Sequence, residues 1–115
     1  MLNFREELSN IKEEKVQKNI NVIVEEGLRS VLNELKKKDI MQFFKEQRFY
    51  FEGDTKTNVL FIKEGSKQNI IFQKTLKNLK ELEISLTILK EEFFKQGYTI
   101  QGVYDSINFF VTIKP

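Results

Sequence analysis

The chain has 115 residues, of which 40% are hydrophobic and 31% are charged, a composition typical of one globular domain. Nineteen lysines and arginines oppose seventeen aspartates and glutamates, so the net charge of +2 argues against a partner chosen by charge alone. The absence of cysteine and histidine excludes disulfides, thiol nucleophiles, imidazole bases and the usual zinc sites. We predict a single domain over residues 1–115, with a helical region over 1–47 and a mixed region over 48–115.

The N-terminal region carries two apolar stripes at helical spacing. Phe4, Leu8 and Ile11 share one face, at intervals of four and three residues. At about 100° per residue, a second stripe lies almost opposite the first. This second stripe comprises Val16, Ile20, Ile23, Val24, Leu28, Val31, Leu32 and Leu35. The region is therefore either one long helix whose two stripes pack against different partners, or two helices with a break near residues 13–15.

The remainder of the chain alternates between strand and helix signals. Asp39 is placed to cap a short helix that presents Ile40, Phe43 and Phe44. Three segments rich in aromatic and β-branched residues then follow, separated by turn clusters, and they predict an antiparallel meander. These segments are residues 48–52, 57–63 and 69–73.

Leucines at helical spacing predict a helix over residues 75–96, and Gly97 follows as a residue that ends helices. Residues 98–104 and 107–114 predict a final hairpin. The order predicts an α+β fold: N-terminal helices, then a five-stranded antiparallel sheet in the order β-β-β-α-β-β, with the long helix packed on one face. We expect Leu79, Leu82, Leu86 and Leu89 to face the core.

Neither end of the sequence nor its interior has the pattern of a membrane segment. The first residues lack the basic and apolar regions of a signal peptide. The longest apolar run, residues 59–62, is far shorter than the about 20 residues of a membrane span. We therefore predict a cytoplasmic protein without a membrane partner. Lysine, isoleucine, phenylalanine, asparagine and glutamate dominate, as AT-rich codons would specify, which is typical of an AT-rich bacterium or its phage.

No set of residues has the pattern of a catalytic or metal site. Acidic pairs such as residues 6–7 and 91–92 are adjacent in predicted helices, so their side chains diverge by about 100° instead of converging on a substrate. The three aspartates lie at predicted caps and turns, and no glycine-rich loop matches a phosphate-binding fingerprint. We predict a protein that is not an enzyme and has no cofactor and no metal site.

Several lysines gather near the predicted start of the 75–96 helix, where positive charge opposes the helix macrodipole. They are Lys67, Lys74, Lys77 and Lys80. Residues 36–38, also lysines, instead stabilise a helix C-terminus and need no partner. We therefore predict that an anionic partner contacts the lysines near the 75–96 helix, and not residues 36–38. Backbone N–H groups at the start of a helix also suit a phosphate.

Three aromatic rings are not explained by core packing: Tyr50, Tyr104 and Phe110. If the helices cover one face of the sheet, the other face carries some of these rings. An exposed aromatic face is typical of a binding surface or an oligomer interface.

The stripe of Phe4, Leu8 and Ile11 needs a cover that the core of the domain does not supply, and a homodimer is the simplest one. The sequence predicts a small, non-enzymatic protein-binding module that self-associates, and a regulator or inhibitor of the kind that phages and mobile elements carry. The alternative is a nucleic-acid-binding accessory protein that uses the lysines near the 75–96 helix.

Overall fold

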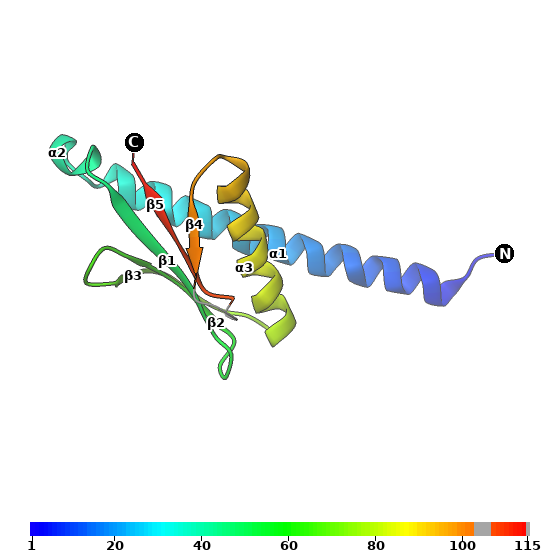
Figure 1. Ribbon diagram of the computed structural model, residues 1–115. Helices are drawn as coiled ribbons and strands as arrows, with labels where there is room; N and C mark the ends of the chain where they lie inside the picture. Colours follow the sequence, from blue (N-terminus) through cyan, green and yellow to red (C-terminus); the bar gives the residue numbers. More distant parts are fainter. Residues whose placement is uncertain (103–106, 115) are drawn as a thin grey trace.

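The computed structural model describes residues 1–102 and 107–114 and has the predicted α+β fold (Figure 1). The elements in chain order are α1 (Phe4–Lys36), α2 (Ile40–Phe43), β1 (Gln47–Asp54), β2 (Val59–Glu64), β3 (Asn69–Thr75), α3 (Leu79–Lys95), β4 (Ile100–Gly102) and β5 (Phe109–Ile113). The strands form one antiparallel sheet in the order β3-β2-β1-β5-β4, so β1 lies at its centre.

Helix α1 is continuous, and no break occurs near residues 13–15. Asn3 caps it, because the side-chain oxygen of Asn3 accepts the backbone N–H of Glu6 at 3.1 Å. Burial divides the helix into two parts: residues 4–18 are exposed throughout, whereas burial begins at residues 19 and 20. We call residues 4–18 the projecting segment and residues 19–36 the packed segment.

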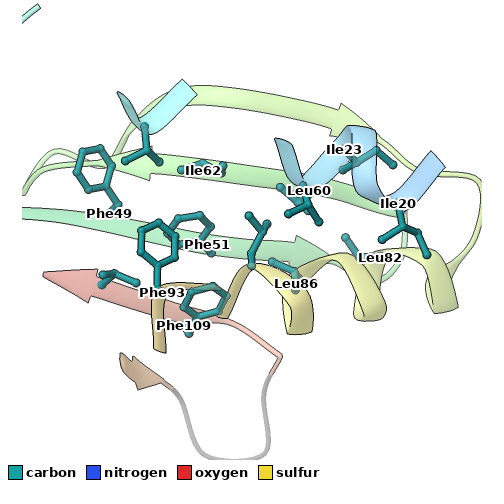
Figure 2. Close-up of a cluster of buried hydrophobic side chains, with 14 of the residues drawn as sticks. Ile20, Ile23, Phe49, Phe51, Leu60, Ile62, Leu82, Leu86, Phe93 and Phe109 are labelled. Carbon is teal, nitrogen blue, oxygen red and sulfur yellow. The ribbon is translucent and has the colours of Figure 1, made fainter. Parts of the chain in front are cut away.

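The core lies between the sheet and two helices. The packed segment contacts α3 and β3, and α3 contacts β1 and β2. Figure 2 shows Ile20 and Ile23 of α1 and Leu86 of α3 lying against strand residues such as Phe51 and Leu60. In β1 and β5, buried residues alternate with less buried ones, as expected for strands with one covered face.

The start of α3 differs from the prediction. Strand β3 continues to Thr75, which pairs with Val59 of β2, and Asn78 caps a helix that begins at Leu79. The predicted core position of Leu79 is therefore wrong: its side chain is 41% exposed, because it opens the first turn. The other three leucines of the stripe, at positions 82, 86 and 89, are fully buried as predicted.

The molecule is elongated, with extents of 64 × 27 × 22 Å and a radius of gyration of 16.5 Å. A compact domain of this length has a radius of gyration of about 13 Å. Figure 1 shows the reason, which is that the projecting segment extends away from the sheet. Among the described residues, no helix combines the length and apolarity needed to cross a membrane.

Candidate functional site

The predicted oligomer stripe lies on the projecting segment. Phe4 is 70% exposed, Leu8 is 55% exposed and Ile11 is 49% exposed. These side chains point almost opposite to Ile20 and Ile23, which face the domain. The domain cannot cover this stripe, because its own packing uses the other side of the same helix.

The projecting segment has little to stabilise it within one copy of the chain. Most helical stability in proteins comes from packing an amphipathic face, and isolated helices of this length are marginal in water. Residues 4–18 are exposed on every side. The described residues of one copy therefore leave this apolar stripe exposed along a segment that nothing else in the chain supports.

The face of the sheet away from the helices carries a group of rings. Tyr50 of β1 and Phe110 of β5 are cross-strand partners, and their ring centroids lie 5.5 Å apart. The guanidinium carbon of Arg48 lies 4.9 Å from the centroid of Phe110. Both rings are half-buried because they cover each other and the arginine covers one of them. Tyr104, predicted with them, lies outside the described residues.

Ion pairing continues across this open face. The Nζ of Lys63 on β2 lies 2.8 Å from Oε2 of Glu52 on β1, and it also lies 5.7 Å from the ring centroid of Phe61. A hollow of about 90 Å³ opens beside Tyr50 and Phe110. Small-molecule sites have volumes of roughly 300–1,000 Å³, so this hollow is too small for a ligand of that class. The polar and aromatic groups named on this open face therefore already contact one another.

The four predicted anion-contact lysines are not brought together. Lys67 lies in the turn between β2 and β3, whereas Lys74, Lys77 and Lys80 lie at or beyond the far end of β3. The seven residues of β3 separate the two positions by about 23 Å. Lys74 is also paired, since its Nζ lies 3.5 Å from Oε2 of Glu26 on α1.

The start of α3 is already capped by the chain itself. The side-chain oxygen of Asn78 accepts the backbone N–H of Glu81 at 2.8 Å. Glu81 places a carboxylate in the first turn, and Lys95 lies in the last turn, so both complement the helix macrodipole. Lys80 still lies in the first turn of α3 and Lys77 directly before the cap, so Glu81 offsets the expected opposition between charge and dipole only in part.

The lysines at the end of α1 take structural roles. The Nζ of Lys38 lies 2.8 Å from Oε1 of Glu64 on β2 and 3.9 Å from Oε1 of Glu34. Lys37 pairs with Glu34 at 3.7 Å. Lys37 and Lys38 therefore pair within the chain, and Lys36 lies in the last turn of α1, where positive charge complements the helix macrodipole.

A second exposed apolar group, on α2, was not anticipated as a surface. Ile40, Met41 and Phe44 are exposed, and Phe43 packs edge-on against Phe44 with centroids 5.4 Å apart. Figure 1 shows α2 at the end of the molecule opposite the N-terminus. The signal available in the sequence was length: a helix of four residues is too short to bury an apolar face.

Carboxylates do not cluster into a metal-binding group in the part of the chain that the structure describes. Three or more metal-ligating side chains are not grouped anywhere within those residues. Asp54 has a pKa below its ordinary value, because its carboxylate accepts the backbone N–H of Lys56 in the turn after β1. This is the hydrogen bonding of a turn residue.

The chain matches no protein-family model, no curated protein and no solved structure. Its function is therefore inferred from the surfaces described above.

Proposed function

We propose that the protein is a small, non-enzymatic protein-binding module that self-associates as a homodimer through the projecting segment of α1. The single observation that carries this proposal is the exposed stripe of Phe4, Leu8 and Ile11 on a helical segment that the domain does not touch. Burial of each such side chain contributes about 1.5–3 kcal/mol, so a partner that covers the stripe also stabilises the segment as a helix.

The exposed residues of α2 are the further surface on which such a dimer would hold another protein. A regulator or inhibitor role, of the kind that phages and mobile elements carry, fits the small size and the AT-rich composition of the chain. We place this role in the cytoplasm, without a membrane partner.

Sedimentation of the wild type at micromolar concentrations tests the proposal, with a dimer expected. The variant Leu8→Glu/Ile11→Glu should be a soluble, folded monomer, because two charges replace aliphatic groups that the dimer would bury. The matched control Ser9→Glu/Asn10→Glu adds the same charge beside the stripe and should remain dimeric. A wild-type monomer, or a dimer unaffected by the first variant, would contradict this interface.

Nucleic-acid binding through the lysines is the weaker alternative, because Lys74 is paired with Glu26 and Lys67 lies at the other end of β3. A mobility-shift assay across a salt series tests it. Binding that weakens with salt and is lost in Lys74→Glu/Lys77→Glu would favour this function, since each phosphate contact contributes to the salt slope.

A further inference from the structure

We propose that the two copies of α1 in this homodimer run parallel, so that their N-termini lie at the same end. This inference rests on the proposed function, because it specifies how the partner lies on the same stripe. The observation that carries it is the placement of charge on either side of the apolar residues.

The stripe has the spacing of a short two-stranded coiled coil. Phe4 and Ile11 occupy the d positions of consecutive heptads, and Leu8 occupies the a position between them. Lys15 follows at the next a position, and Lys18 at the next d position. These two lysines end the apolar part of the seam, so the paired region is confined to the projecting segment.

The positions that flank the seam carry opposite charges on its two sides. Position e holds Arg5 and Lys12, and position g holds Glu7 and Glu14, all of them exposed. In a parallel pair, g of one helix lies beside e of the next heptad of the other helix, so Glu7 faces Lys12 of the second copy. The symmetry of the dimer gives this contact twice.

An antiparallel pair brings like charges together. Position e then meets e, which places Arg5 beside Lys12 of the second copy, and position g meets g, which places glutamates beside each other. Like-charge contacts on both sides of so short a seam disfavour this arrangement. The charges at positions e and g therefore select a second copy of this chain in the parallel orientation, and the two copies of Lys15, which then face each other, mark the end of the paired seam.

The domain leaves room for this partner. The packed residues Ile20, Ile23 and Val24 lie on nearly the opposite side of α1 from the stripe. Two copies joined along the stripe would therefore place their sheets on the outer sides of the helix pair. Neither domain then competes for the seam.

Disulfide cross-linking tests the orientation, because the chain has no cysteine and a single introduced thiol is unambiguous. In a parallel dimer, Lys15→Cys places two position-a thiols across the two-fold axis from each other. In an antiparallel dimer centred on Leu8, residue 15 lies beside the start of the other helix. The matched control is Glu13→Cys, at position f on the outer side.

In a glutathione redox buffer, Lys15→Cys should form covalent dimers and Glu13→Cys should remain reduced. A dimer by sedimentation in which Lys15→Cys fails to cross-link would overturn the parallel orientation and leave self-association intact. A wild type that is monomeric at micromolar concentrations would overturn both proposals.

Charge reversal gives an independent test at low salt. In the parallel dimer, Lys12→Glu places Glu7 of each copy beside a carboxylate at position 12 of the other copy. The two repulsive contacts should raise the dimer dissociation constant roughly tenfold. An equimolar mixture of Lys12→Glu and Glu7→Lys should restore the affinity, because the heterodimer again pairs opposite charges. In an antiparallel dimer, Lys12→Glu would instead attract Arg5, so an unchanged or lower dissociation constant overturns the inference.

Discussion

The packed and projecting segments of α1 share one continuous backbone and have opposite surroundings. In the packed segment, Ile20 and Ile23 lie in the core between α3 and the sheet. In the projecting segment, Leu8 and Ile11 are exposed, and their face is turned almost to the other side of the helix. The helix therefore packs on its own domain along one face, and in the proposed dimer it contacts a second copy along the other.

This division has an energetic consequence. Contacts of the packed segment contribute to the free energy of unfolding of the domain, because they are lost when the domain unfolds. Contacts of the projecting segment contribute only when a partner is present, so their effect depends on protein concentration. Substitutions of the same chemistry in the two segments should accordingly have different consequences.

The largest difference is expected between two isoleucines. Ile23→Ala removes a side chain that is 2% exposed and should lower the free energy of unfolding by about 2–5 kcal/mol, through lost transfer energy and the cavity that remains. Ile11→Ala should leave the unfolding of the monomer within about 0.5 kcal/mol of the wild type. Urea unfolding monitored at concentrations below dimerisation measures both. Equal losses would mean that the projecting segment packs on the domain.

A smaller difference is expected at the boundary of the two segments. Nδ2 of Asn19 donates to Oε1 of Glu81 at 2.7 Å, and the Glu81 side chain is buried at the start of α3. Asn19→Ala leaves this carboxylate oxygen without that donor and should cost about 1–3 kcal/mol.

The matched control for Asn19 is Gln17→Ala, which removes an exposed hydrogen bond to Asn21 of 2.9 Å. Its cost should stay below about 0.5 kcal/mol, because water replaces an exposed partner. Thermal unfolding of both variants checks this prediction. A Gln17→Ala variant as unstable as Asn19→Ala would place the boundary of the domain further toward the N-terminus.

Periodicity predicts which residues are buried more reliably than it predicts where an element begins or ends. The sequence predicts the buried leucines of α3 because the same face of this helix packs on the sheet along most of its length. In α1 the apolar stripe changes phase between the projecting and the packed segments, and a change of phase resembles a break even though the helix is continuous. The prediction that α3 starts at residue 75 is wrong, because Thr75 is held extended by its pairing with Val59 on the neighbouring strand β2.

The candidate surfaces also differ in how well the sequence predicts them. The exposure of Phe4, Leu8 and Ile11 follows from a stripe that the core could not accommodate, and the sequence carries that signal. The separation of Lys67 from Lys74, and the pairing of Lys74 with Glu26, depend on how β3 and α1 lie in space. Local sequence does not encode a contact between residues so far apart in the chain.

The smallest and sharpest test compares two helix caps of identical chemistry. Asn3 and Asn78 each accept the backbone N–H three residues later, at 3.1 and 2.8 Å, one at the start of the projecting segment and one at the start of α3. Asn78→Ala should lower the free energy of unfolding by about 1 kcal/mol, because α3 forms only with the domain. Asn3→Ala should not change the domain's unfolding and should only reduce helicity near the N-terminus. Urea unfolding together with amide hydrogen exchange over residues 4–18 separates these effects. The Asn3 variant should lose its exchange protection mainly at low protein concentration, because at high concentration the partner helix holds the segment in place of the cap.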